Sequence, residues 1–256
     1  MATLNRDGVS LYYEVHGDGP ALLLTHGYSA TSRMWAGQID VFSRHYRLIL
    51  WDMRGHGASD YPADPAAYSE AATVADMAAL LDAVGAETAI VGGLSLGGYM
   101  SLAFHLTHPE RVRALLIIDT GPGYRNDEAR EGWNRNALKT AERYEIEGLG
   151  RLAAGSVEMR TSTHRSAEGL ALAARGMLTQ KDARVISSLP TIAVPSLVVV
   201  GADDTPFLAA SDYMAAKIPG ARKVVIANAG HAANIDQPEA FNIAVLDFLK
   251  TEGLQT

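Results

Sequence analysis

Six short apolar runs recur along the chain, and polar or glycine-rich stretches separate them. Runs of this length that are apolar at nearly every position indicate strands buried on both faces, as in a parallel sheet. They therefore predict the strands of a mostly parallel sheet. The runs are Ala21–Leu24, Leu48–Trp51, Ala89–Val91, Ala114–Ile118, Ser196–Val200 and Lys223–Ile226.

An earlier segment, Val9–Val15, has a different pattern. Its apolar residues alternate with polar ones, so that Val9, Leu11, Tyr13 and Val15 share one side. Strict alternation is typical of a strand with one buried and one exposed face. We predict an antiparallel edge strand here.

Amphipathic helices are predicted between the strands. Ser69–Val84 carries apolar residues at spacings of three and four, and Gly85 follows as a C-cap. Pro238–Leu249 has the same spacing, with proline near the first helical position. Strands that alternate with helices predict an α/β fold with an open, doubly wound, mostly parallel sheet.

The interval Gly121–Pro190 breaks this alternation, because it contains helical patterns but no clear strand. A structureless loop of about seventy residues is improbable, so we predict a helical insertion. It holds 11 of the 22 Lys and Arg residues and 9 of the 29 Asp and Glu residues, a net charge of about +2. One interpretation is solvated amphipathic helices. The other is a lid over an active site that tolerates or attracts an acidic substrate.

Composition excludes several classes of protein. The 256 residues include no cysteine, which excludes disulfides, thiolate zinc sites, iron–sulfur clusters and a cysteine nucleophile. A net charge of −7 argues against nucleic-acid binding. The first eight residues lack the apolar core of a signal peptide, and no run approaches the roughly 20 apolar residues of a membrane span. We expect a soluble cytoplasmic protein that binds neither nucleic acid nor membrane.

The pattern Gly93-x-Ser95-x-Gly97 stands between the predicted strand Ala89–Val91 and the helical stretch Tyr99–Leu106. In a nucleophile elbow, a serine sits at the top of a tight strand-to-helix turn. Side chains two residues to either side would collide, so glycine is needed at both positions. The turn also places Ser95 at a helix start, where free N–H groups stabilise negative charge.

A serine nucleophile needs a base, and histidine is the usual one. His231 follows the predicted strand Lys223–Ile226, at the edge of the sheet where functional groups gather. His26 and His56 stand in glycine-rich loops, and we interpret them as residues that organise these loops by hydrogen bonding. The other histidines are interpreted as surface or packing residues: His16, His45, His105, His108 and His164.

The base in turn needs an acid that fixes its tautomer. Asp203 and Asp204 follow the predicted strand Ser196–Val200, and Asp119 follows Ala114–Ile118. Each of the three is a candidate, because loop aspartates can either catalyse or cap the next helix.

The chain resembles the α/β-hydrolase family over nearly its whole length. A serine, then an aspartate, then His231 is the order of the triad in that fold. Five motifs stand in family order: His26-Gly27, Asp52-x-Arg54-Gly55-His56-Gly57-x-Ser59, Gly93-x-Ser95-x-Gly97-Gly98, Gly201-x-x-Asp204 and Gly230-His231.

The resemblance implies roles for particular residues. Ser95 is the nucleophile, His231 is the base, and Asp204 is the acid, because the family's acid usually falls three residues after the strand-end glycine. The oxyanion hole is formed by the backbone N–H groups of Tyr28 and Leu96. It also implies a single domain over residues 1–256, with a helical cap over residues 121–190 inserted after the sixth strand.

The implied activity is hydrolysis of a small carboxylic ester or lactone through an acyl-enzyme, without metal or cofactor. One alternative is hydrolysis of a carbon–carbon bond in ring-cleavage products, which favours a cation in the site. The other is a ligand receptor on the same fold. Trp133, Met100 and Phe207 are candidates for the substrate pocket, although packing roles explain them equally well. The sequence carries no signal for the oligomeric state.

Overall fold

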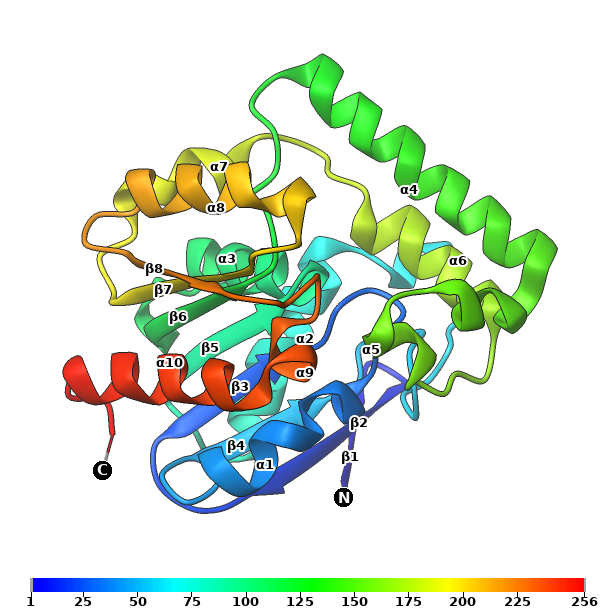
Figure 1. Cartoon of the computed structure of the whole chain (residues 1–256). Coiled ribbons are helices and arrows are strands. Elements are labelled where there is room, and N and C mark those ends of the chain that lie inside the picture. The colour runs from blue at the N-terminus through cyan, green and yellow to red at the C-terminus, as the bar shows by residue number, and fades with distance from the viewer. Residues whose placement is uncertain (1, 256) are drawn as a thin grey trace.

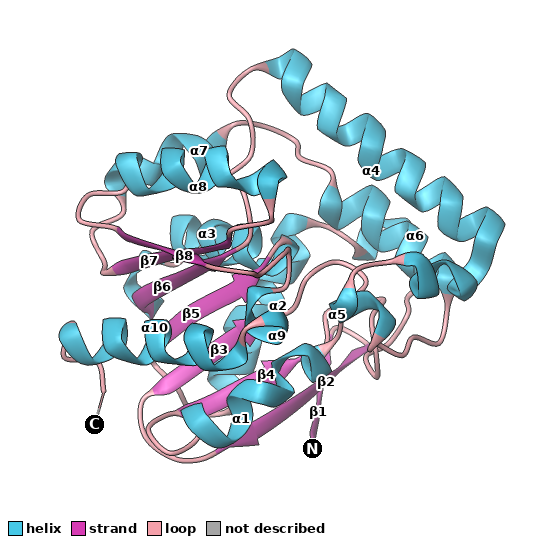
Figure 2. Cartoon of the chain, in the orientation of Figure 1, coloured by secondary structure: helices cyan, strands magenta, loops and turns pink. Residues whose placement is uncertain are grey.

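A computed structural model describes residues 2–255 and contains one eight-stranded sheet. The strand order is β1-β2-β4-β3-β5-β6-β7-β8. The first two pairings, β1 with β2 and β2 with β4, are antiparallel, and all the others are parallel (Figure 2). The strands are β1 Ala2–Arg6, β2 Val9–His16, β3 Ala21–Thr25, β4 Arg47–Trp51, β5 Ala89–Leu94, β6 Val112–Ile118, β7 Ser196–Gly201 and β8 Arg222–Ile226.

The connections run in opposite directions from β3. The chain passes from β3 to β4 on one side, and it then returns to β5 on the other side of β3. Because crossovers between parallel strands are right-handed, this reversal places helices on both faces of the sheet. In such sheets, ligands bind beyond the carboxyl ends of the strands at the point of reversal. The ends of β3 and β5 are therefore where a site is expected.

Helices cover both faces of the sheet (Figure 1). The α2, α3 and α8 helices pack on one face, and α1 and α10 pack on the other. The bounds of these helices, and of the short α9, are α1 Ala36–Phe42, α2 Glu70–Ala83, α3 Leu96–Thr107, α8 Thr205–Lys217, α9 Ala233–Asp236 and α10 Pro238–Thr251.

Successive residues of a central strand contribute to opposite cores. Leu23 belongs to the cluster that contains the α2 and α3 side chains, whereas Leu22 and Leu24 belong to the cluster of α1 and α10. All three are fully buried. Complete burial of such a side chain contributes about 1.5–3 kcal/mol, so two buried faces explain the near-continuous apolar runs of the inner strands. The prediction of two buried faces is wrong for β8, because this strand stands at the edge of the sheet and four of its five residues are exposed or half-buried.

The sequence prediction for the first strand is wrong in one respect. Val9–His16 is antiparallel to its neighbours, as predicted, but it is not the edge of the sheet, because β1 pairs with it from Ala2 to Arg6. The β1 sequence, ATLNR, contains little apolar pattern. Its residues are exposed or half-buried, so there is no buried face that the sequence could signal.

The interval 121–190 consists of helices joined by loops and contains no strand, as predicted. We call residues 121–190 the helical segment. It follows β6, the sixth strand once β1 is counted. Figure 1 shows its longest helix, α4, running above the body of the molecule. Its α-helices are α4 Asp127–Glu147, α5 Val157–Arg160, α6 Ala167–Ala173 and α7 Arg184–Ser188, with a π-helical turn over Ala174–Leu178.

The helical segment has a small core of its own that rests on the body. Tyr144 and Leu170 are fully buried in it, and the Tyr28 side chain of the body packs against it. The Tyr144 hydroxyl donates to Ser29 Oγ at 2.8 Å, and the Tyr28 hydroxyl donates to the Leu170 carbonyl at 2.7 Å. No helix among residues 2–255 is long and apolar enough to cross a membrane.

Candidate active site

Ser95 stands in strained backbone geometry between β5 and α3. Its φ is 55° and its ψ is −117°, a region that non-glycine residues rarely adopt. A Cβ on Gly93 would lie 2.5 Å from the Gly97 carbonyl carbon, and a Cβ on Gly97 would lie 2.2 Å from the Thr25 carbonyl oxygen. Both flanking glycines are therefore required by the close approach of backbone, as the sequence motif predicts.

A cleft with an empty volume of about 580 Å³ opens at Ser95. Its walls come from the elbow, from the loop after β6, from the helical segment and from the start of α8. The side chains are mainly apolar and aromatic, which is typical of small-molecule sites. The lining residues are Ser95, Leu96, Tyr99, Thr120, Gly121, Pro122, Gly123, Tyr124, Trp133, Leu178, Gln180, Pro206, Phe207 and Ala210.

His231 and Asp204 meet at the ends of β8 and β7. The Asp204 carboxylate is 5% exposed, and its Oδ2 lies 2.9 Å from His231 Nδ1. Phe207, which lines the cleft, stacks on the His231 ring at 5.1 Å between centroids. Burial lowers the pKa of His231, but the hydrogen bond and the charge of Asp204 outweigh it, so that the pKa is raised overall.

The other two candidate acids are placed differently. Asp203 is exposed. Asp119 is fully buried, and its carboxylate accepts from the backbone N–H of Gly201 at 2.7 Å and of Ala233 at 3.3 Å. Burial raises the pKa of Asp119 to about 8, although the Gly201 hydrogen bond opposes the shift. Asp119 therefore ties together the loops that carry Asp204 and His231, while Asp204 alone of the three contacts the imidazole.

The loop after β3 lies against the elbow. A Cβ on Gly27 would lie 3.5 Å from Ser95 Cβ, and the Ala30 N–H donates to the Gly27 carbonyl at 3.1 Å, which closes the turn around Tyr28. Leu96 is the first residue of α3, and first-turn N–H groups have no partner within a helix. The structure thus places both segments with predicted oxyanion-hole amides beside Ser95.

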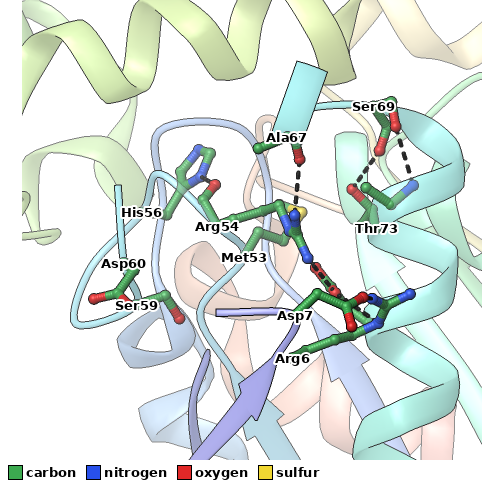
Figure 3. Close-up of polar contacts among 12 residues, drawn as sticks. Arg6, Asp7, Met53, Arg54, His56, Ser59, Asp60, Ala67, Ser69 and Thr73 are labelled. Atoms are coloured by element: carbon green, nitrogen blue, oxygen red, sulfur yellow. Dashed lines mark hydrogen bonds and ion pairs between the residues drawn. The ribbon is translucent and has the colours of Figure 1, made fainter. Parts of the chain in front are cut away.

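The loop after β4 is anchored by a buried ion pair. Arg54 Nε and Nη2 each donate to the Asp76 carboxylate of α2 at 2.6 Å, and Nη1 donates to the Ala67 carbonyl at 3.0 Å (Figure 3). A bidentate pair of this kind fixes both distance and orientation. His56, on the same loop, lies beside Arg54, and its Nδ1 is 3.1 Å from the Arg54 carbonyl oxygen.

Three histidine rings form a cluster between the body and the helical segment, with tilted and edge-to-face contacts. The His26 and His56 ring centroids are 5.0 Å apart, and those of His56 and His164 are 5.6 Å apart. His26 Nε2 accepts from the Met53 N–H at 2.9 Å, and His164 Nδ1 accepts from the Gly57 N–H at 3.1 Å. The prediction that His26 and His56 organise loops is confirmed. His164 is half-buried and joins the helical segment to the body, a role without a local sequence signal.

We expect this histidine cluster to make the free energy of unfolding depend on pH. Burial lowers the pKa of His26 from 6.5 to about 4. Between these two pH values, His26 is protonated in the unfolded chain but neutral in the folded chain. Folding is therefore unaffected above pH 7 and is destabilised as the pH falls through 6.5 towards 4. At pH 5, His26 alone should cost about 2 kcal/mol. Urea unfolding at pH 7 and 5 measures this loss.

His26→Gln should flatten the pH dependence of the unfolding free energy by that amount, whatever its effect at pH 7. His108→Gln, at the end of α3, removes a histidine outside the histidine cluster and serves as the control. An unchanged pH slope in His26→Gln would show that His26 is protonated equally in both states.

The candidate pocket residues separate into two groups. Trp133 and Phe207 line the cleft, whereas Met100 is fully buried in the core beneath it. Among residues 2–255, none of the lysines and arginines of the helical segment lines the cleft. The structure thus favours solvated helices over a cationic lid. Nor do the described residues include a group of three or more His, Asp or Glu side chains placed to hold a metal.

Comparison with known proteins decides the family. Residues 20–166, more than half of the chain, match the family model described as the alpha/beta hydrolase fold. The chain belongs to the α/β hydrolase family. It is 30% identical to a putative 2-succinyl-6-hydroxy-2,4-cyclohexadiene-1-carboxylate synthase of Bacillus subtilis, covering 97% of this chain and 99% of that protein.

This α/β hydrolase is also similar to proteins with other names. It is 29% identical to 3-oxoadipate enol-lactonase 2 of Acinetobacter baylyi, with 97% of this chain and 96% of that protein covered. Among solved structures, a thermophilic esterase from Thermogutta terrifontis is 30% identical, with a TM-score of 0.85 and coverage of 98% of this chain and 97% of that chain. The predicted fold is confirmed, and the chain is a hydrolase of this family.

Proposed function

We propose that this α/β hydrolase cleaves a small carboxylic ester or lactone through an acyl-enzyme on Ser95. His231 is the general base and acid, and Asp204 orients it. The backbone N–H groups of Tyr28 and Leu96 form the oxyanion hole.

The observation that carries the proposal is the backbone of Ser95. A φ of 55° at a non-glycine residue is strained, and it persists here because the glycines and β3 around it leave no alternative. Strain of this kind, at the mouth of a cleft and at the start of a helix, favours a nucleophile over a bystander serine. The 2.9 Å contact between His231 Nδ1 and Asp204 supports the base.

The proposed reaction needs no cofactor. Ser95 Oγ attacks the carbonyl carbon while His231 Nε2 takes its proton, and the Asp204 carboxylate accepts a hydrogen bond from Nδ1–H and stabilises the imidazolium. The carbonyl oxygen becomes an oxyanion, for which each backbone donor is worth about 3 kcal/mol. His231 then gives the proton to the leaving alkoxide. Water, activated by the same imidazole, releases the acid and restores Ser95.

We also propose that the helical segment is a cap within one hydrolase domain over residues 1–256. In sequence it stands between Ser95 and the Asp204–His231 pair, so that the elements carrying the three residues flank it on both sides. It contributes half of the lining of the cleft, including Tyr124, Trp133 and Leu178. Its side chains would therefore determine substrate specificity, while residues of the body carry out the reaction.

Carbon–carbon bond hydrolysis of an acidic ring-cleavage product is the weaker candidate, because the described lining contains no cation for a substrate carboxylate. Turnover of a panel of simple esters, lactones and ring-fission dienoates, with Ser95→Ala as the blank, tests the choice. We expect repeated turnover of esters or lactones. Turnover of dienoates without esters would overturn the proposal, and so would a single slow turnover with ligand retention, which is the behaviour of a receptor.

A further inference from the structure

The cleft wall contains one buried amide that the proposed mechanism does not use. Gln180 lines the cleft and is only 8% exposed, yet its Oε1 has no hydrogen-bond partner among residues 2–255. A buried polar atom without a partner is costly and uncommon. An unpaired amide in the wall of a binding site is explained when a ligand supplies the missing partner.

The backbone of Gln180 is held by the side chain of Asn134 on α4. Its backbone N–H donates to Asn134 Oδ1 at 2.8 Å, and its carbonyl accepts from Asn134 Nδ2 at 2.9 Å. Gly123 leaves room for the side chain, since a Cβ there would lie 2.9 Å from Gln180 Oε1. The backbone of Gln180 is therefore anchored to α4, and its side-chain amide lies against a glycine of the cleft wall.

Three other polar side chains of the wall already have hydrogen-bond partners. The Tyr99 hydroxyl donates to the Glu70 carboxylate at 2.8 Å, Trp133 Nε1 donates to the Leu178 carbonyl at 2.8 Å, and Thr120 Oγ1 donates to the Ser95 carbonyl at 2.7 Å. Their donor protons are engaged within the protein. The Gln180 amide, by contrast, keeps its hydrogen-bonding capacity for whatever fills the cleft.

The charges around the cleft disfavour an anion. None of the described lining residues is charged, and Glu70 stands directly behind Tyr99. The nearby Arg184 is neutralised, because it pairs with Glu70 at 3.5 Å and with Asp182 at 2.8 Å. A substrate carboxylate in the cleft would lose its hydration without gaining a cation.

We propose that Gln180 is a specificity-determining residue that hydrogen-bonds an uncharged polar group, such as a carboxamide, in the part of the substrate that fills the cleft. An amide side chain offers a donor and an acceptor, so it complements a group that also has both. An apolar substrate group would leave the Gln180 amide without a partner. A carboxylate could accept a hydrogen bond from the Gln180 N–H but could not donate one to Oε1. This inference rests on the proposed ester or lactone hydrolysis and narrows its substrate class.

Three isosteric acyl chains test the inference. The p-nitrophenyl esters of 5-methylhexanoate, 4-carbamoylbutanoate and glutarate end in an isopropyl group, a carboxamide and a carboxylate on the same skeleton. The acetates of 4-methylpentan-1-ol, 4-hydroxybutanamide and 4-hydroxybutanoate place the same ends on the alcohol side. Each kcat/KM is divided by the rate of alkaline hydrolysis of that ester, so that intrinsic reactivity cancels.

In at least one series we expect the normalised kcat/KM for the carboxamide ester to exceed that for the carboxylate ester by tenfold or more. In that series Gln180→Leu should lower the carboxamide-to-isopropyl ratio about tenfold, because the substrate amide then loses its partner. Gln255→Leu, the same change near the C-terminus, should leave the ratio unaltered. If the role of Gln180 were merely structural, Gln180→Leu would lower kcat/KM for the carboxamide and isopropyl esters equally, and their ratio would not change.

Gln180→Glu, which keeps the side-chain shape, is the second variant if Gln180→Leu does not fold. In this variant the normalised kcat/KM for the carboxylate ester should fall further relative to that for the carboxamide ester. Equal use of carboxylate and carboxamide by the wild type in both series, or an unchanged ratio in the variants, overturns the inference while ester turnover stands. Absence of any Ser95-dependent turnover refutes the proposed function instead.

Discussion

Replacing Ser95 with alanine should lower kcat on a small ester by about 10⁵–10⁶-fold, because the acyl-enzyme can no longer form. The elbow leaves no neighbour to take over: Gly93 and Gly97 flank it, and His231 without Ser95 could only activate water. The residual rate over the uncatalysed reaction would come from substrate binding and the oxyanion hole. Steady-state kinetics with p-nitrophenyl butyrate measures the loss.

A fluorophosphonate probe gives a second readout that does not depend on finding a good substrate. It should label the wild type at Ser95, as mapped by peptide mass spectrometry, and it should fail to label Ser95→Ala. Ser43→Ala, a serine-to-alanine change at the end of α1, is the matched control and should be labelled like the wild type. Labelling of another serine in Ser95→Ala would contradict the elbow assignment.

The elbow could be predicted from sequence because its constraints are local. Gly93, Ser95 and Gly97 meet one another and the end of β3 within a single turn, so the spacing itself encodes the geometry. The inner parallel strands could be predicted for a similar reason, since burial on both faces leaves a continuous apolar run. By contrast, β1 is exposed or half-buried and is recruited only by backbone pairing with β2.

Residues that act across long sequence distances left no comparable signal. Asp203 and Asp204 are adjacent and chemically identical, so only the resemblance to the family favoured Asp204, and the fold shows that Asp203 is exposed whereas Asp204 contacts His231. Gln180 is anchored by Asn134, 46 positions away, and no motif marks either residue. Met100 was a reasonable pocket candidate, but the face of α3 on which it lies belongs to the core.

Asp204→Asn should lower kcat by about 10³–10⁴-fold, because an amide can present its N–H to His231 Nδ1 and so stabilise the wrong imidazole tautomer. The Asp204 carboxylate is buried beside the imidazole, so solvent is a poor substitute for it. Asp203→Asn is the matched control: the same chemical change one residue earlier, at an exposed side chain, should leave kcat within about twofold of the wild type.

The pH dependence of kcat/KM shows whether Asp204→Asn acts by removing the carboxylate charge or by displacing the loop that carries it. Asp204 keeps the pKa of His231 raised against the effect of burial, and a base must be neutral to accept a proton, so wild-type kcat/KM should fall on the acid side of that raised pKa. Without the Asp204 charge, burial dominates and the pKa of His231 falls. The acid limb of Asp204→Asn should therefore move to lower pH, while that of Asp203→Asn should stay in place. An acid limb that instead moves in Asp119→Asn alone would transfer the role of Asp204 to Asp119, whose carboxylate holds the same two loops.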